Sequence, residues 1–78
     1  MINTIETGRK IRELIKHSRY SVTDVSDILN ISKTAMYCWF RGESLPSIDN
    51  LCLLAELLEI RVDDMISYSK ILNISKAA

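Results

Sequence analysis

Glycine and proline are scarce in this chain: two glycines and one proline stand among 78 residues. Together with an apolar fraction of 47%, this scarcity argues against disorder or a turn-rich β protein and favours a compact helical one. No apolar run approaches the roughly 20 residues that a helix needs to cross a bilayer. The N-terminus is polar and does not resemble a signal peptide. We therefore expect one small cytoplasmic domain with no membrane partner.

Residues that could carry out catalysis or bind a metal are also few. The chain has one histidine, His17, and two cysteines, Cys38 and Cys52, which form no CxxC or Cys/His cluster. A zinc site is therefore not expected. No acid–base pair, nucleophile arrangement or phosphate-binding loop can be assembled from these residues. We predict that the protein is not an enzyme and has no cofactor, metal or small-molecule substrate.

Net charge is absent as well, because ten Lys and Arg balance ten Asp and Glu. A neutral chain argues mildly against a nucleic-acid partner, for which a basic balance is usual. The charges are unevenly distributed, however. Residues 1–42 have seven bases and four acids, a net +3, and residues 43–78 have three bases and six acids, a net −3. Because screening limits the reach of a charge to about 10 Å, the N-terminal half can still face DNA.

Residues 20–42, YSVTDVSDILNISKTAMYCWFRG, have the pattern of two short helices joined by a tight turn. Ser21, with an acid three residues later, forms a capping-box pattern at the start of the first helix. Asn30 tolerates the left-handed conformation of a sharp turn, and Ser32 is a good cap for the second helix. Such a pair of helices places its second member, here about residues 32–41, in a DNA major groove.

Apolar residues at helical spacing predict an all-α fold, a compact bundle of five helices. The helices are expected at about residues 4–17, 21–29, 32–41, 47–58 and 62–66. Their inward-facing side chains are expected to include Ile5, Ile11, Leu14, Ile15, Val25, Ile28, Leu29, Ala35, Met36, Trp39, Ile48, Leu51, Leu54, Ala55 and Leu58. Residues 1–66 would form the DNA-binding domain. Residues 67–78 would form a tail, with Ile71, Leu72 and Ile74 docking on the bundle or on a dimer partner.

Residues 32–60, SKTAMYCWFRGESLPSIDNLCLLAELLEI, resemble the phage-repressor-like helix-turn-helix family, also called lambda-repressor-like or XRE-type. The resemblance covers roughly residues 8–66 and follows the family order of recognition helix, Arg-Gly stop, Pro-Ser start and Leu-rich fourth helix. It implies a five-helix bundle that binds double-stranded DNA sequence-specifically, usually as a dimer. It also implies a role in transcriptional regulation, and we predict a repressor.

Positions shared with that family imply which residues contact DNA. The residues expected to read base edges are Lys33, Thr34, Tyr37 and Cys38. The residues expected to bind phosphates are Ser21, Ser32, Arg41 and Ser44. Without the resemblance, Lys33 and Tyr37 could equally be solvated surface residues. Cys38 could be a small filler residue or an oxidation-sensitive thiol.

Some positions depart from the family pattern. Val22 stands where many members hold a phosphate with Gln, and Glu43 stands where a base is frequent and would repel phosphate. Both changes lower the expected affinity for DNA. Ile15 and Phe40 stand where the family often has an Arg–Glu ion pair, which packed apolar residues can replace at no net cost. We expect these two side chains to touch.

Leu53 and Leu57 form an extra i, i+4 pair outside the core-facing stripe of their helix. An exposed apolar pair in a small protein usually has a partner, which here is either the tail or a second copy of the chain. We favour a homodimer, which would place two recognition helices about 34 Å apart. The alternative function is a protein–protein interaction module on the same fold with weak or lost DNA binding. Neutral charge, Val22, Glu43 and the Leu53/Leu57 pair support that alternative.

Overall fold

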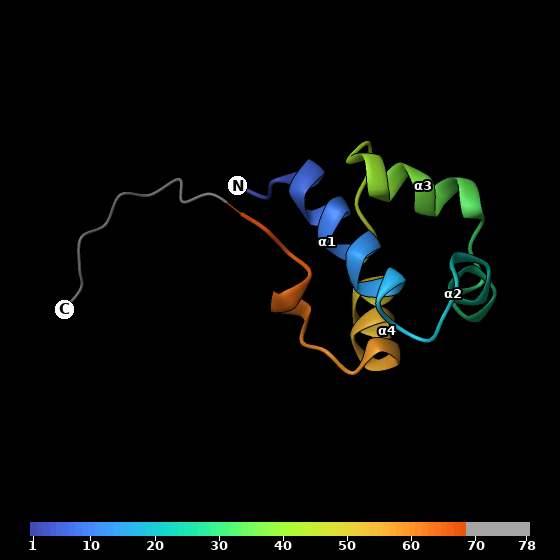
Figure 1. Ribbon diagram of the computed structural model, residues 1–78. Coiled ribbons are helices and arrows are strands. Elements are labelled where there is room, and N and C mark those ends of the chain that lie inside the picture. Colours follow the sequence, from blue (N-terminus) through green and yellow to red (C-terminus); the bar gives the residue numbers. More distant parts are fainter. Residues whose placement is uncertain (69–78) are drawn as a thin grey trace.

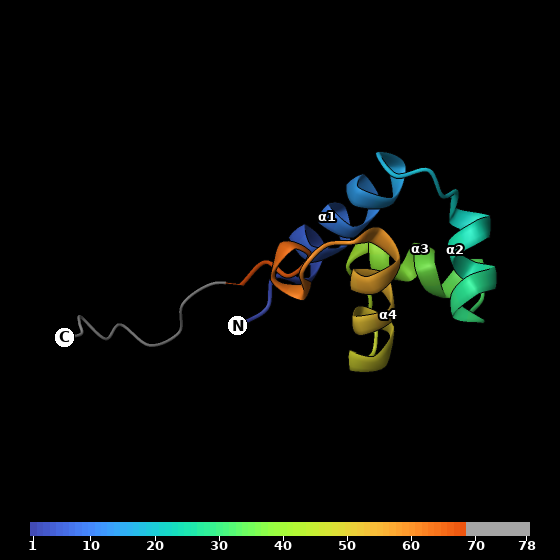
Figure 2. The same ribbon diagram turned by 90° about the horizontal axis from the view of Figure 1, so that it is seen from below.

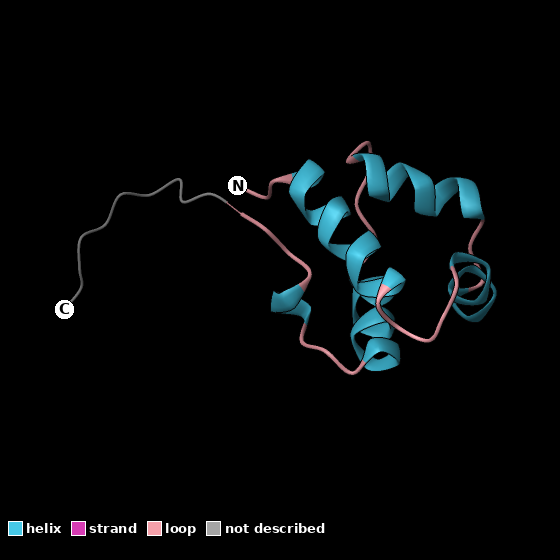
Figure 3. Ribbon diagram, viewed as in Figure 1, coloured by secondary structure: helices cyan, strands magenta, loops and turns pink. Residues whose placement is uncertain are grey.

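The computed structural model describes residues 1–68, which form four α-helices and one short 3-10 helix (Figure 1). The elements in chain order are α1 (Thr4–Lys16), α2 (Val22–Leu29), α3 (Lys33–Arg41), α4 (Ile48–Leu58) and η1 (Val62–Asp64). Helices account for the regular structure drawn over the described part of the chain (Figure 3), which confirms the all-α class. Within those residues no helix is long and apolar enough to cross a membrane.

The predicted fifth helix at residues 62–66 is wrong. Val62–Asp64 is a single 3-10 turn of three residues, and four α-helices are present in the described part. A segment this short gains too few hydrogen bonds to offset the cost of starting an α-helix. The chain then leaves the turn, because Ser67 bonds to the start of α1 instead of continuing a helix.

The ends of the helices are set by local sequence signals. Ser21 caps α2 by accepting a hydrogen bond from the Asp24 N–H at 3.0 Å, and the Asp24 carboxylate returns a bond to the Ser21 N–H at 2.9 Å. The predicted capping box is therefore confirmed. Asn30 and Gly42 end α2 and α3 in the left-handed conformation, with φ of 56° and 77°. The turn that fixes the angle between α2 and α3 thus follows directly from Asn30.

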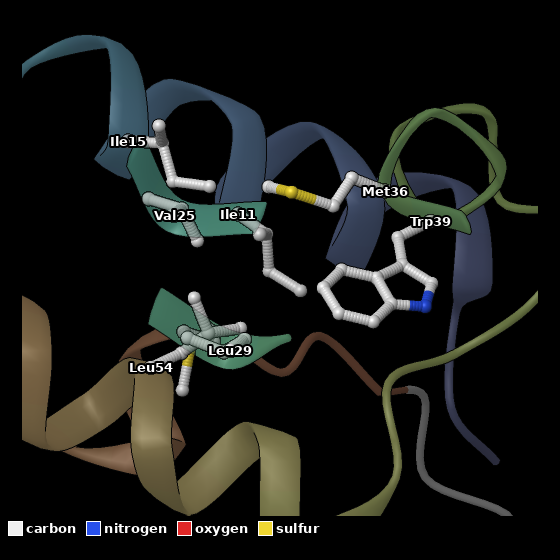
Figure 4. Close-up of a cluster of buried hydrophobic side chains, with 8 residues drawn as sticks. Ile11, Ile15, Val25, Leu29, Met36, Trp39 and Leu54 are labelled. Carbon is white, nitrogen blue, oxygen red and sulfur yellow. The ribbon is translucent and has the colours of Figure 1, made fainter. Parts of the chain in front are cut away.

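Eight apolar side chains form the buried core, contributed by all four α-helices and by the residue after η1 (Figure 4). They are Ile11, Ile15, Val25, Leu29, Met36, Trp39, Leu54 and Met65. Three residues predicted to face inward are instead exposed: Ile5 (69%), Ile28 (54%) and Ile48 (78%). Ile5 and Ile48 lie in the first turns of their helices and outside the buried cluster. Ile28 precedes the buried Leu29 by one residue, so its side chain points about 100° away around the helix.

The backbones of α1 and α3 approach each other at Gly8. A Cβ atom at this position would lie 1.9 Å from the carbonyl oxygen of Trp39 and 2.9 Å from that of Phe40. Glycine in the middle of a helix ordinarily costs about 1 kcal/mol relative to alanine. Here the absence of a side chain allows α3 to lie directly on α1. Trp39, whose carbonyl makes this contact, is itself buried (5% exposed).

The described end of the chain is attached to the start of α1. The Asn3 N–H donates to the Ser67 carbonyl at 2.7 Å, and the buried Thr7 hydroxyl accepts from the Ser67 N–H at 2.9 Å. Ile2 and Tyr68 form an antiparallel β-bridge. Ile71, Leu72 and Ile74, which were expected to dock, lie outside the described residues.

Substituting Gly8 with alanine should destabilise the fold, although alanine is the better helix former. The added methyl would overlap a backbone carbonyl, and overpacking of this kind typically costs about 1–3 kcal/mol. Urea unfolding should show a net loss of that order, whereas Lys16→Ala, at an exposed position of the same helix, should be nearly neutral. If Gly8→Ala stabilised the protein, α1 and α3 could not be in direct backbone contact.

Candidate nucleic-acid interface

Helix α3 has one buried side and one outer side. Met36 is fully buried and Trp39 is 5% exposed, so both anchor the helix in the core. Lys33 and the residues one, four and five positions after it lie on the side of the helix away from Met36 and Trp39. The structure therefore brings the four predicted base-reading residues together on one outer surface, with three of them exposed and the cysteine half-buried. These residues are Lys33, Thr34, Tyr37 and Cys38.

Tyr37 is held by an aromatic neighbour that the sequence analysis did not assign to the site. Its ring packs edge-on against the ring of Phe40, with centroids 5.7 Å apart and an interplanar angle of 85°. Phe40 in turn packs partly buried against the core. Edge-to-face pairs of this kind are favourable, so Phe40 restricts the positions available to Tyr37. The i, i+3 spacing of two aromatics on a predicted helix was the signal that could have revealed this role. The expected contact of Phe40 with Ile15 stays a prediction.

The two predicted phosphate-binding serines at helix starts have different surroundings. The Ser21 cap of α2 shares its position with the Asp24 carboxylate, which places a negative charge where a phosphate would bind. Ser32 caps α3 by accepting from the Ala35 N–H at 3.0 Å, and the first turn of α3 contains no acid. A helix N-terminus attracts anions through its dipole and its N–H groups. The start of α3 is therefore the more suitable place for a phosphate.

Arg41 at the end of α3 is engaged within the protein. Its Nε donates to Glu43 Oε2 at 2.8 Å and its Nη2 donates to Oε1 at 3.3 Å. These bonds lower the pKa of Glu43 below its ordinary value of 4.5 and raise the pKa of Arg41. The Glu43 carboxylate therefore stays ionised to a lower pH than an ordinary glutamate, and the ion pair is lost as the pH falls through this lowered pKa. At neutral pH the Glu43 carboxylate occupies the guanidinium that was predicted to bind a phosphate.

Ser44 and Cys38 complete the set of residues predicted to contact DNA. Ser44 is exposed just beyond this ion pair. The Sγ atom of Cys38 lies 3.6 Å from Arg41 Nη2, so the thiol borders the same cluster. Over residues 1–68, the His, Cys, Asp and Glu side chains form no group of three or more that could hold a metal.

The sequence profile of the helix-turn-helix family matches residues 11–65, which is more than half of the chain. This chain belongs to the helix-turn-helix family. The predicted family membership is confirmed, and the matched region contains all of α2, α3 and α4. No curated protein matches the sequence of this helix-turn-helix protein.

Two solved structures resemble this helix-turn-helix domain in fold. One is the restriction-modification controller protein C.AhdI from Aeromonas hydrophila, with 21% identity and a TM-score of 0.70 over 80% of this chain and 94% of that one. The other is the SOS-response transcriptional repressor LexA from Eubacterium rectale, with 20% identity and a TM-score of 0.72 over 94% of this chain and 77% of that one. Identities this low establish a shared fold alone.

A second surface of the domain lies between α2 and α4. We call it the α2–α4 groove; it is lined by Tyr20, Ile28, Leu53, Glu56, Leu57 and Glu59. Leu53 is 45% exposed, as predicted, whereas Leu57 is partly buried against the core. Figure 1 shows α3 and α4 at opposite edges of the molecule, so this groove and the outer side of α3 are separate surfaces.

Replacing Glu43 with glutamine should strengthen DNA binding severalfold. The substitution releases Arg41 for a phosphate, and each additional phosphate contact steepens the dependence of log affinity on log salt by about one. Fluorescence anisotropy with a labelled duplex measures both quantities. Asp63→Asn removes the same charge from η1, beside Arg61, and should change the affinity less. Equal effects of the two variants would mean that Arg41 is not near a phosphate.

Proposed function

We propose that this helix-turn-helix protein is a transcriptional regulator that binds double-stranded DNA with the outer side of α3 in the major groove. The supporting observation is the placement of Lys33, Thr34 and Tyr37. All three are exposed on a helix whose opposite side is fixed by Met36 and Trp39. A helix anchored in this way presents polar side chains of different chemistry to base edges at a fixed spacing.

Each outer residue has a chemical role in this proposal. The Lys33 ammonium donates to guanine N7 and O6, and the Thr34 hydroxyl or methyl contacts a base edge or a thymine methyl. Tyr37, positioned by Phe40, contacts the next base. Cys38 is half-buried and lies beside the residues proposed to contact bases. Ser32, at the acid-free start of α3, donates a hydrogen bond from its hydroxyl to a phosphate oxygen.

We further propose that the protein acts as a repressor, by covering a promoter as a homodimer. A single helix of nine residues contacts few bases, and a two-fold pair of such helices reads two half-sites about 34 Å apart. The similar fold of a transcriptional repressor and of a restriction-modification controller protein supports a regulatory role. Arg41, released from Glu43 on binding, and Ser44 would supply further phosphate contacts, whereas the Asp24 carboxylate disfavours the contact predicted for Ser21.

One set of observations favours the second candidate function, a protein–protein interaction module. Asp24 and Glu43 both place carboxylates at predicted phosphate positions. The α2–α4 groove also exposes apolar side chains, among them Ile28 and Leu53. A domain that used only this groove would need no contact between α3 and DNA.

Replacing Lys33 and Tyr37 together with alanine should lower affinity for a duplex selected from a random pool by about 100-fold, because each base contact contributes about 1–3 kcal/mol. The matched control removes a base and a tyrosine elsewhere, Arg61→Ala with Tyr68→Ala, and should bind almost as well as the natural protein. Circular dichroism should show that both variants remain folded.

Salt dependence separates the two candidate functions. A DNA-binding protein loses affinity steeply between about 50 and 200 mM salt, because phosphate contacts release counterions. Binding that is absent at low salt, or that survives the double substitution, would exclude α3 as the reading helix. The interaction module would then be the better description.

A further inference from the structure

The α2–α4 groove combines an apolar floor with an acidic border. Ile28 (54% exposed) and Leu53 (45% exposed) open the floor to solvent. The acids that line the groove or the hollows adjoining it are Asp24, Asp27, Asp49, Glu56 and Glu59. Arg19 is the base on the same surface, and its guanidinium lies 5.3 Å above the Tyr20 ring. The complement of such a surface is a segment that is apolar and basic.

This charge pattern opposes the simplest form of the proposed homodimer. In a two-fold contact the same surface of both copies meets itself. A direct contact through Leu53 would therefore bring the acids of one copy, such as Asp49 and Glu56, against those of the other. Like charges placed across an interface disfavour association strongly. A dimer built on this groove needs a source of positive charge.

The chain itself contains a segment of the required chemistry. Residues 69–78, SKILNISKAA, have two lysines, Lys70 and Lys76, and no acid. Between these lysines stand the three apolar residues Ile71, Leu72 and Ile74. By contrast, residues 43–68 contain six acids and one base. The segment therefore matches both the floor and the border of the groove.

Ile71 and Leu72 cannot reach the Tyr20 end of the groove in their own copy. Tyr68 is paired with Ile2 before the start of α1, whereas Tyr20 in the groove follows the end of α1. Thirteen helical residues at 1.5 Å each separate these ends by about 20 Å. Leu72, four residues beyond Tyr68, can extend at most about 14 Å. Figure 2 also shows the described end of the chain and α2 at opposite ends of the molecule.

We propose that residues 70–76 of one copy bind in the α2–α4 groove of a second copy. The same residues of the second copy bind in the groove of the first. Ile71 and Leu72 cover the exposed floor around Leu53. Lys70 and Lys76 pair with the acidic border at Glu56 and Glu59. This inference rests on the proposed homodimer and specifies what holds it together.

A charge-exchange experiment on full-length chains tests the proposal. One variant carries Lys70→Glu and Lys76→Glu, and the other carries Glu56→Lys and Glu59→Lys. Each alone should self-associate at least about tenfold more weakly in sedimentation equilibrium, because every segment now meets a groove of its own sign. Mixing the two should restore a dimer, since each segment then fits the groove of the other chain. Docking within one copy could not be rescued by mixing.

The control keeps the net charges and moves the basic substitutions out of the groove. Asp63→Lys with Asp64→Lys, on η1, replaces the groove variant in the mixture. This control keeps a natural segment and groove and should dimerise with itself. It should not restore the Lys70→Glu and Lys76→Glu chain to a full dimer, because the acidic segment of that chain still meets an acidic groove. Rescue by this control would show general attraction between oppositely charged chains and would overturn the proposal. So would a natural protein that stays monomeric, or one whose dimer is unaffected by the Lys70 and Lys76 substitutions. In those cases a foreign basic segment becomes the candidate occupant of the groove.

The same samples distinguish failure of this inference from failure of the proposed DNA-binding function. Monomeric variants should still bind a DNA half-site with a steep salt dependence, because α3 is unchanged. Loss of half-site binding on substituting Lys70 and Lys76, without any rescue in the mixture, would assign these lysines to DNA and overturn the exchange.

Discussion

The direct contact between the backbones of α1 and α3 at Gly8 determines where the outer side of α3 lies. A Cβ at Gly8 would lie 1.9 Å from the Trp39 carbonyl oxygen, so the backbone of α3 rests directly on that of α1. The same closeness recurs at Gly42, where a Cβ would lie 2.7 Å from the Ile5 Cα. Burial of Met36 and Trp39 then fixes the rotation of α3 about its axis. Packing alone therefore determines which residues of α3 lie on its outer side.

The distribution of charge makes some parts of the surface more suitable for phosphate binding than others. The start of α3 is basic and free of acids, whereas its end is neutralised because Arg41 pairs with Glu43. The start of α2 carries the Asp24 carboxylate. The proposed phosphate binding is therefore expected mainly at the start of α3, near Ser32. A single domain with so few contacts would bind weakly, which is why the proposed function needs a second copy and why the groove on the opposite side matters.

Much of the fold could be predicted from local sequence signals, because caps and left-handed stops depend on adjacent residues. The capping box at Ser21 and the stop at Asn30 were predicted on that basis and are confirmed. Gly42, at the Arg-Gly stop of the family pattern, ends α3 in the same left-handed conformation. The periodicity of apolar residues was less reliable at the ends of helices. Ile5 and Ile48 fit the apolar spacing of their helices. Their burial depends on tertiary packing, however, and the spacing of residues within one helix carries no information about that packing.

Other features of the site depend on contacts that spacing alone does not specify. The sequence indicated that Glu43 would repel phosphate, but the structure adds that it also occupies Arg41. The packing of Phe40 on Tyr37 was missed because the sequence analysis considered only a contact of Phe40 with Ile15. The family membership is confirmed. The roles of individual residues in DNA binding stay predictions.

The most direct test of DNA contact by α3 is a nuclear magnetic resonance titration of the nitrogen-15-labelled protein with a duplex selected from a random pool. We expect the largest changes in amide shifts at residues 32–38. They should fade as salt rises, because the contacts include phosphates. Largest changes on α4, or none even in dilute buffer, would contradict the assignment of α3 as the reading helix.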